Sequence, residues 1–533
     1  MQGPDFRALR IGALARGRYI AVTFIFLMSA PVPTLGQRKP EPEESDINTK
    51  RQEWFFGMRA YPRGFIPGTA RLKALERVRQ MAGPAPRSVR QSATVSSSQW
   101  TSIGPQPINT YSQLNAGRIW ALGVDPGNTA VAYAGTDGGG VWKTTNGGTT
   151  WAPLTDQQAS LGITSLALDP SNSAVIYAGT GGSAAIAAGI LKSTDGGNTW
   201  TQITGPFLPA DEYPLQVSAI AVNAGNDQIV LAGASGYGIY RSTDAGATWT
   251  SVLPDITMYE VFFDPSNTSN AYATVYGQGV YKSTDTGQTW SLINGSGTNA
   301  LPIASMGAIN IAISPSSPGT IYAALKNSSN DLLLGFYKTT NGGNNWLPIA
   351  APPNDNVDYW NWSLRVHPTN PNVVFAGSLL LSRSLDGGNT WTDVGDEGPP
   401  FIHVDQHSQV FSPDGNTLYI GNDGGVWSTT GPSASSITWI DLNTTFATTL
   451  FYPGLSINPT NVNIAFAGAQ DNGTEYYQGN LSWNEVACGD GGWTAIDFVN
   501  PQNVYATCQE IDIWKSTDGG TVLESCAKRY QYH

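Results

Sequence analysis

An octapeptide with one acidic or amide residue recurs along the chain, as in "STDGGNTW" at 193–200. A carboxylate in such a turn could serve as a general acid or base. It could instead accept N–H groups of its own turn, while the glycine adopts positive φ and the tryptophan packs between repeats. Because every repeat needs such a turn, we interpret these residues as structural. They are Asn146, Asp195, Asp244, Asp285, Asn341, Asp386 and Asp518.

The segment "HVDQH" gathers three more residues that could do chemistry, His403, Asp405 and His407. On a β-strand they would share one face, because side chains alternate. Such a trio could hold a metal, line a ligand site or form a structural network. Same-face residues are about 7 Å apart, so one strand rarely supplies three ligands to one ion. We therefore expect no metal and no cofactor, and keep the trio as a candidate ligand-facing cluster.

Two further segments carry side chains that suit sugar recognition. In "YWNW", Tyr359, Trp360 and Trp362 could stack on sugar rings or pack between repeats. In "QDNG", the polar run Gln470, Asp471 and Asn472 could form a binding loop or a type I′ turn. Both segments are therefore candidate ligand-binding sites.

The composition favours an all-β protein with short strands and tight turns. Only 13% of the 533 residues are charged, and there are 60 glycines and 17 tryptophans. The net charge is −12, and the acidic excess lies in residues 100–533. Phosphate binding needs a concentrated basic surface, so nucleic acid is excluded as the expected partner.

The N-terminal region differs from the rest. Residues 1–36 combine arginines with a short apolar run, which predicts a signal peptide cleaved near Gly36 and a secreted or periplasmic protein. The run is too short for a transmembrane span. Residues 37–99 predict an extension with a short helix after Pro67, whose Leu72, Leu75 and Val78 form one stripe, and then a Pro/Ser-rich linker.

From Trp100 onward, units of roughly 40 to 55 residues repeat nine times, each with four predicted strands. This predicts a β-propeller, either seven blades plus part of a second propeller or one large ring of eight to ten. We assign blades with octapeptides to 100–400 and further blades, as a possible second propeller, to 401–520. Residues 521–533 depart from the repeat and are interpreted as an aberrant tail. Cys488 and Cys508 flank predicted neighbouring strands and could form a disulfide.

The octapeptide is identified as the Asp-box, or bacterial neuraminidase repeat, and residues 100–520 resemble Asp-box propellers. The stretches 116–148, 402–430 and 468–506 resemble exported glycosyl-hydrolase-like proteins related to glycoside hydrolase family 74 and the sortilin ectodomain. A sialidase is excluded, because the propeller's arginines outside the boxes and the tail are Arg118 and Arg365. The resemblance to sialidases would imply three arginines that hold the substrate carboxylate, and two arginines cannot form that clamp.

The resemblance to family 74 implies an inverting hydrolase of xyloglucan-type β-glucan with two catalytic aspartates. Asp137 in "GTDGGGVW" matches the base, and Asp490 in "CGDGGW" resembles the acid with one residue fewer before the aromatic. Asp423 in "GNDGGVW" repeats the setting of Asp137 and is a rival. The resemblance to sortilin implies the alternative, a non-catalytic propeller that binds a glycan or peptide. Expected partners are thus a polysaccharide or oligosaccharide, or a peptide.

Overall fold

The computed structural model describes most of the chain from residue 101 onward. The described residues are 57, 60, 66–67, 69–81, 101–110, 112–183, 185–208, 215–254, 256–330, 332–353, 363–395, 398–487, 489–508 and 512–526. They form one 12-residue α-helix, three short 3₁₀ helices and many short antiparallel strands. The predicted all-β class is confirmed.

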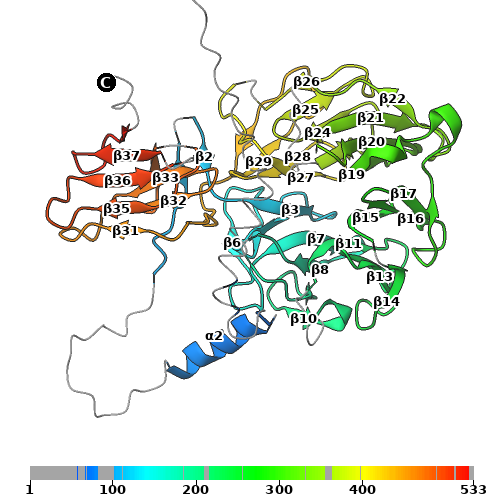
Figure 1. The fold of residues 1–533 in the computed structure, drawn as a ribbon. Helices are drawn as coiled ribbons and strands as arrows, with labels where there is room; N and C mark the ends of the chain where they lie inside the picture. The colour runs from blue at the N-terminus through cyan, green and yellow to red at the C-terminus, as the bar shows by residue number, and fades with distance from the viewer. Residues whose placement is uncertain are drawn as a thin grey trace, which may run out of the picture. The chain divides into compact units, whose positions relative to one another are not determined.

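Among the described residues, 119–441 form seven four-stranded sheets, each an antiparallel meander in chain order (Figure 1). The first four sheets contain β3 (Ile119–Val124), β4 (Ala132–Thr136), β5 (Val141–Thr144), β6 (Ala152–Pro153); β7 (Ile163–Asp169), β8 (Asn172–Thr180), β9 (Ile190–Ser193), β10 (Thr201–Ile203); β11 (Val217–Val222), β12 (Val230–Ala234), β13 (Gly238–Ser242), β14 (Thr250–Pro254); β15 (Met258–Asp264), β16 (Asn267–Val275), β17 (Gly279–Ser283) and β18 (Ser291–Leu292). The next three contain β19 (Met306–Ser314), β20 (Ser317–Asn327), β21 (Leu333–Thr339), β22 (Leu347–Ile349); β23 (Ser363–Val366), β24 (Val374–Gly377), β25 (Leu381–Ser384), β26 (Thr392–Asp393); β27 (Gln406–Phe411), β28 (Leu418–Asn422), β29 (Gly425–Thr429) and β30 (Ile440–Asp441). The 3₁₀ helices are η1 (Gly205–Phe207), η2 (Gly297–Asn299) and η3 (Ile303–Ser305).

The seven sheets close into a ring, because the first packs against the last. Strand β3 contacts β27 and β28. Ile119 of β3 and Val426 of β29 lie in one buried apolar cluster with Phe446. The Ala116 N–H donates to the Gly424 carbonyl at 2.7 Å. A seven-bladed propeller followed by further blades is therefore the architecture, and the single large ring is not.

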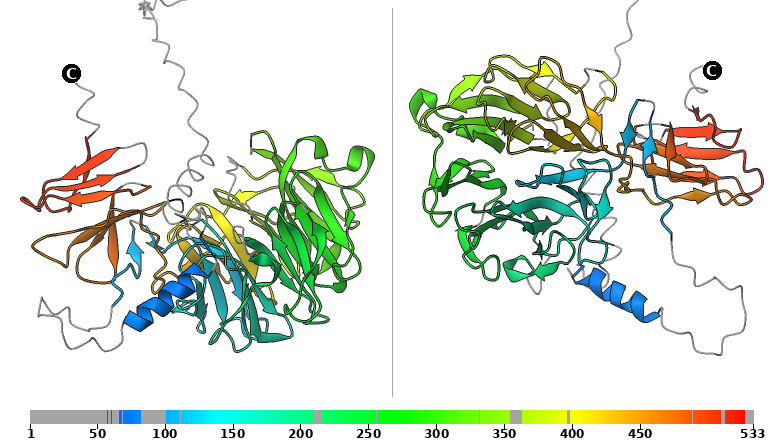
Figure 2. Two further views of the ribbon diagram at one scale, coloured as in Figure 1. Left: turned by 60° about the horizontal axis from the view of Figure 1, so that its bottom comes forward. Right: turned by 180° about the vertical axis from the view of Figure 1, so that it is seen from behind.

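Two more sheets follow the ring in the described part of the chain (Figure 2). The eighth contains β31 (Ser456–Ile457), β32 (Ala465–Ala469), β33 (Gly473–Tyr477) and β34 (Trp483–Ala487), and the ninth β35 (Thr494–Ile496), β36 (Val504–Thr507), β37 (Ile513–Ser516) and β38 (Glu524–Ser525). The hairpin β1 (Ile108–Asn109) and β2 (Leu114–Asn115) extends the eighth sheet, since Ile108 pairs in parallel with Trp483. The N-terminal side of the ring is thereby joined to the eighth sheet.

Two predicted boundaries differ from this arrangement. The division at residue 400 falls between β26 and β27, inside the ring, because the seventh blade extends to Asp441. The segment 521–533 was expected outside the repeat, yet β38 pairs with β37 through Lys515 and Glu524. The box sequence is broken there, but the strand that follows it still completes the ninth sheet.

The Asp-box turn is held by its own side chains. In the third blade, Asp244 Oδ1 accepts the Thr248 N–H at 2.8 Å and Oδ2 accepts the Thr248 hydroxyl at 2.6 Å. Ser242 Oγ donates to Asp244 and accepts the Gly246 N–H. The same bond, from the N–H of the seventh residue of the box to the side chain of the third, occurs at Asn146, Asp195, Asp285, Asn341, Asp386 and Asp518. Their interpretation as turn residues agrees with these contacts.

The boxes also connect neighbouring blades. Lys143 Nζ of β5 donates at 2.8 Å to the carbonyl of Gly196 in the next box. Lys192 Nζ and the Tyr177 hydroxyl both donate to the carbonyl of Ala245 in the box after that. A box turn presents carbonyls that the preceding blade can reach, which explains why it recurs at the same place in successive blades.

The predicted N-terminal helix is α2 (Ala70–Met81). Its contacts differ from the expected apolar stripe, since Val78 is 62% exposed and Leu72 and Leu75 are half-buried. Arg71 instead donates to the carbonyls of Gln158 and Asp156 in the turn before β7. Mean hydropathy along the helix is low, so polar bonds to backbone carbonyls provide the attachment.

Replacing Asp244 with alanine should destabilise the protein, and replacing it with asparagine should not, because Asn146 already accepts the same N–H in the first box. We expect a loss of about 1 kcal/mol for alanine, as for other side chains that cap a turn or helix end. Bonds from Thr248, and then from Ser242, lower the pKa of Asp244 to about 2. Its contribution is therefore present above pH about 4 and lost as the pH falls through about 2.

Urea unfolding midpoints of the two variants measure this effect. Equal midpoints for alanine and wild type at pH 7 would contradict the assigned turn role.

Candidate functional site

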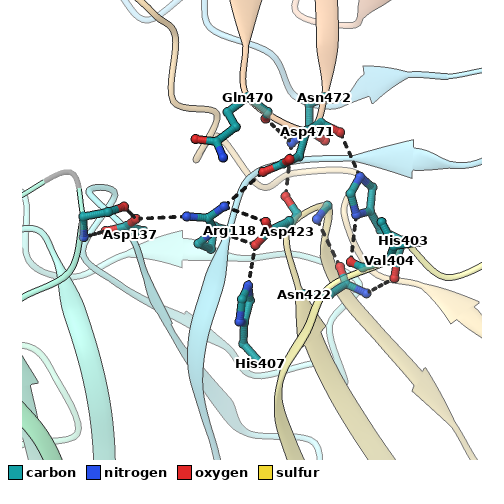
Figure 3. Close-up of polar contacts among 12 residues, drawn as sticks. Arg118, Asp137, His403, Val404, His407, Asn422, Asp423, Gln470, Asp471 and Asn472 are labelled. Carbon is teal, nitrogen blue, oxygen red and sulfur yellow. Dashed lines mark hydrogen bonds and ion pairs between the residues drawn. The ribbon is translucent and has the colours of Figure 1, made fainter. Parts of the chain in front are cut away.

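Arg118 lies at the centre of a polar cluster, directly before the inner strand β3 (Figure 3). Its Nε and Nη2 donate to the two carboxylate oxygens of Asp423 at 2.5 and 2.6 Å. Nη2 also donates to Asp471 Oδ2 at 3.0 Å, and Nη1 is 3.8 Å from Asp137 Oδ2. The three carboxylates raise the pKa of Arg118 although burial opposes this. One cation is therefore shared by three aspartates.

Asp423 is the most tightly held of the three. It occupies the turn between β28 and β29 and is 4% exposed. His407 Nε2 of β27 is 2.5 Å from its Oδ1. The ring of Trp120 packs on His407, with 4.4 Å between centroids, and lies under the Arg118 guanidinium. Burial alone would raise the pKa of Asp423, but Arg118 and His407 outweigh it and hold the pKa well below its usual range.

Asp137 follows β4 and is covered by the chain after β8. It forms an isolated bridge with Gly162, and its side chain has 0% exposure. The Ser183 N–H donates to Oδ1 at 3.0 Å, and the Ser183 hydroxyl donates to Oδ2. Gly182 has φ +111° and approaches so closely that a Cβ there would collide with Asp137. Access to this carboxylate therefore passes through the half-buried Ser183.

Asp471 comes from the eighth sheet, in the loop 470–472 between β32 and β33. Its backbone is left-handed, with φ +60°, and His403 Nε2 is 2.9 Å from its carbonyl oxygen. The neighbouring Asn472 donates to the Asp423 carbonyl at 3.1 Å. Burial, followed by the charge of Asp423, raises the pKa of Asp471 to about 9, although Arg118 opposes this. Asp471 thus carries a proton at neutral pH while Asp423 is ionised.

Asp490, the acid that the family resemblance implies, contacts the same loop. Its Oδ1 accepts the Asp471 N–H at 2.9 Å. Gln470 of the loop accepts from the Tyr452 hydroxyl at 3.0 Å. The structure therefore gathers Asp137, Asp423 and Asp471 on Arg118, and assigns the Asp490 carboxylate a bond to the backbone of Asp471.

The shared face predicted for His403, Asp405 and His407 is wrong. Only His407 lies in β27; His403 and Asp405 precede it. Asp405 has φ +67°, which interrupts the strand alternation, and a register shift follows between Gln406 and Ser408. His403 and His407 accordingly turn to different partners, Asp471 and Asp423.

Carboxylate oxygens of Asp405, Asp423 and Asp471 lie within 4.8 Å of one another. A cation could fit such a trio, but Arg118 already pairs with Asp423 and Asp471. We therefore assign no metal there.

Some predicted site residues lie outside the described part of the chain. These are Tyr359, Trp360, Trp362 and Cys488. Cys508 is disulfide-bonded and Cys526 is free, which leaves the predicted pairing of Cys508 with Cys488 as a prediction.

Arg118 and Ser183 were missed by the sequence analysis. In the sequence, Arg118 was weighed only as part of an arginine clamp. It is one of two arginines in the repeats that lie outside the boxes and the tail, and this rarity was the signal that could have marked it as a site residue. Ser183 carried no signal, because it reaches Asp137 from 46 residues away through a loop of ordinary composition.

Comparisons with known proteins agree with the predicted fold. A family model described as "Sortilin, neurotensin receptor 3" matches residues 237–378. A GH74 enzyme of Niastella koreensis superposes with TM-score 0.60 and 22% identity, covering 79% of this chain and 68% of that one. The GH74 xyloglucanase of Xanthomonas campestris gives 0.56 and 20%, covering 78% and 74%. An ancestral GH74 enzyme gives 0.57 and 19%, covering 79% and 63%.

A search of curated proteins found no match. At these identities the structural likeness shows the fold, so the chain is a propeller of the kind found in sortilin-type and GH74 proteins, as predicted. No helix in the described residues is long and apolar enough to cross a membrane.

Replacing Arg118 with methionine should destabilise the protein strongly, because it leaves the buried Asp423 carboxylate without its main partner. Removing one partner of a buried pair costs about 3–5 kcal/mol. Adding Asp423→Asn should recover much of that loss, since the second variant removes the buried charge. A double-mutant cycle of denaturant unfolding measures this, and strict additivity would contradict the assigned pairing.

Proposed function

We propose that the chain is an exported glycoside hydrolase that cleaves a neutral β-glucan of the xyloglucan type with inversion. The observation that carries the proposal is a pair of carboxyl groups that face one guanidinium, that of Arg118, in different surroundings. Asp471 keeps its proton at neutral pH, whereas Asp137 accepts two hydrogen bonds from Ser183 and faces a cation. Such divergence between neighbouring carboxyl groups marks acid and base roles.

The separation of the two groups is compatible with inversion. Nη1, which faces Asp137, and Nη2, which binds Asp471, belong to one guanidinium. The two carboxylate oxygens are therefore at most about 9 Å apart, which does not exceed the upper end of the roughly 6.5–9.5 Å range for the carboxyl pairs of inverting enzymes.

Hydrolysis would use Asp137 as the base and Asp471 as the acid. Water adds its oxygen to the anomeric carbon, and its proton passes to the Ser183 hydroxyl as Ser183 gives its own proton to Asp137. The bond between the anomeric carbon and the leaving oxygen breaks, and Asp471 gives its proton to that oxygen. Ser183 enters because Asp137 has no exposed side-chain surface of its own.

The acid assignment departs from the family resemblance, which implies Asp490. The Asp490 carboxylate accepts the Asp471 N–H, a contact that supports a role in holding the acid. Asp471 reaches the cation that also faces Asp137, and Asp490 has no such contact among the described ion pairs.

The alternative is a non-catalytic propeller that binds a glycan or a peptide. The match to the sortilin family model favours this alternative. The burial of the Asp137 side chain beneath Ser183 also favours it, because a catalytic base must be reached by water. The fold supports either function.

Wild-type protein should release reducing ends from xyloglucan or a related β-glucan, and Asp137→Asn should lower the rate by about 10²–10⁴-fold, as expected for loss of a general base. Ser183→Ala should lower it less, because water could then approach Asp137 directly. Asp244→Asn, in a box far along the ring, is the matched control and should keep full activity. Binding of a glycan without any product would support the alternative function.

An oligosaccharide glycoside with a nitrophenol leaving group should separate Asp471 from Asp490. This leaving group needs no proton, so Asp471→Asn should lose polysaccharide cleavage and keep most of the aryl glycoside cleavage. Asp490→Asn should change both modestly, since its amide oxygen can still accept the Asp471 N–H, whereas Asp490→Ala should lower both. If Asp490→Asn instead loses polysaccharide cleavage and keeps aryl glycoside cleavage, Asp490 is the general acid.

A further inference from the structure

Asp423 carries a negative charge in a buried position. It is almost fully buried in the turn between β28 and β29, and it is ionised because Arg118 and His407 bind it together. Asp137, Ser183 and Asp471 perform the proposed hydrolysis steps, and Asp423, bound to Arg118, takes part in none of them. Its charge therefore needs an explanation that the hydrolysis steps do not give.

Two consequences follow from the geometry. The bidentate contact at 2.5 and 2.6 Å fixes the guanidinium, so that Asp471 receives only one bond from it, at 3.0 Å. The Asp423 carboxylate also lies beside Asp471, with oxygens within 4.8 Å. Two carboxyl groups at this distance resist ionising together.

We infer that Asp423 is a positioning residue of the proposed active site: as a fixed buried anion it takes most of the charge of Arg118 and so keeps the proton on Asp471. The inference rests on the proposed function for its catalytic meaning. His407 supports it from the other side, because its ring nitrogen binds Asp423 and its own side chain is 2% exposed.

The groups around Asp471 give the sign of the effect. Burial and the charge of Asp423 are the largest causes that raise the pKa of Asp471 to about 9, Asp490 adds to them, and Arg118 opposes them. Removing the Asp423 charge takes away a repulsion and also frees Arg118 to pair more fully with Asp471. Both changes lower the pKa of Asp471. The charged and titratable groups that face this pair are Arg118, Asp405, His403, His407 and Asp490.

The test is the pH dependence of polysaccharide hydrolysis by wild type and Asp423→Asn. Activity of the wild type should fall on the alkaline side near pH 9, where Asp471 loses its proton. In Asp423→Asn this fall should move about two pH units lower or more, so that activity at pH 8 drops about tenfold or more relative to wild type. His407→Gln, which keeps an N–H donor, should move it little, and Asp244→Asn should not move it.

A purely structural role predicts a different result. Asp423→Asn would then lower activity by one factor at every pH, with the alkaline fall still near pH 9, and that outcome would overturn the inference.

Infrared difference spectra provide a readout that does not depend on activity. At pH 8, the spectrum of wild type minus Asp471→Asn should contain the band of a protonated carboxyl group, and the same difference in the Asp423→Asn background should lack it. A band present in both backgrounds would overturn the inference even if the enzyme is active. If the wild type hydrolyses no glycan but the band behaves as expected, the proposed function fails while the charge relation between Asp423 and Asp471 stands.

Discussion

The buried ion pair between Arg118 and Asp423 is the interaction on which the rest of the structure depends. Arg118 belongs to the first blade and Asp423 to the seventh, so the pair spans the closure of the ring. Burying two charges is costly unless their geometry and remaining hydrogen bonds are good. Here both carboxylate oxygens receive guanidinium N–H groups, and His407 contacts one of them. The sequence can retain the pair because both oxygens of the buried carboxylate have partners.

The same pair brings the eighth sheet to the ring. Arg118 has donors left over after binding Asp423, and one of them reaches Asp471. Asn472 adds a bond to the Asp423 carbonyl, and His403 contacts the Asp471 carbonyl. Ring closure, the contact with the next sheet and the candidate acid are thus three results of one arrangement. Around Arg118 three carboxyl groups face one guanidinium, and Asp471 is the one among them whose pKa is raised.

The fold could be predicted from sequence because its signals are local. A box fixes its turn through bonds between residues two to four positions apart, as Ser242, Asp244 and Thr248 do. Strand alternation then defines the blade. The number of blades in the ring could not be predicted in this way, because a ring of seven blades and a ring of nine have the same local sequence pattern. Long-range contacts, such as that of β3 with β27, distinguish the two rings.

The site was predicted less well, for a related reason. Asp137, Asp423 and Asp471 were found by their Gly-rich or polar turns, but their common partner Arg118 is 305 residues from Asp423 in sequence. The trio in "HVDQH" was misplaced because Asp405 adopts a left-handed conformation without glycine, which a pattern of alternating residues does not reveal.

Neutron diffraction from a crystal exchanged into heavy water at neutral pH would test the central claim most directly. It locates each exchangeable hydrogen, so it reads the protonation of both carboxyl groups beside Arg118. The account predicts a deuterium on Asp471 and none on Asp423, with Arg118 bound through both Asp423 oxygens. An ionised Asp471 paired with Arg118, or a deuterium on Asp423, would contradict it.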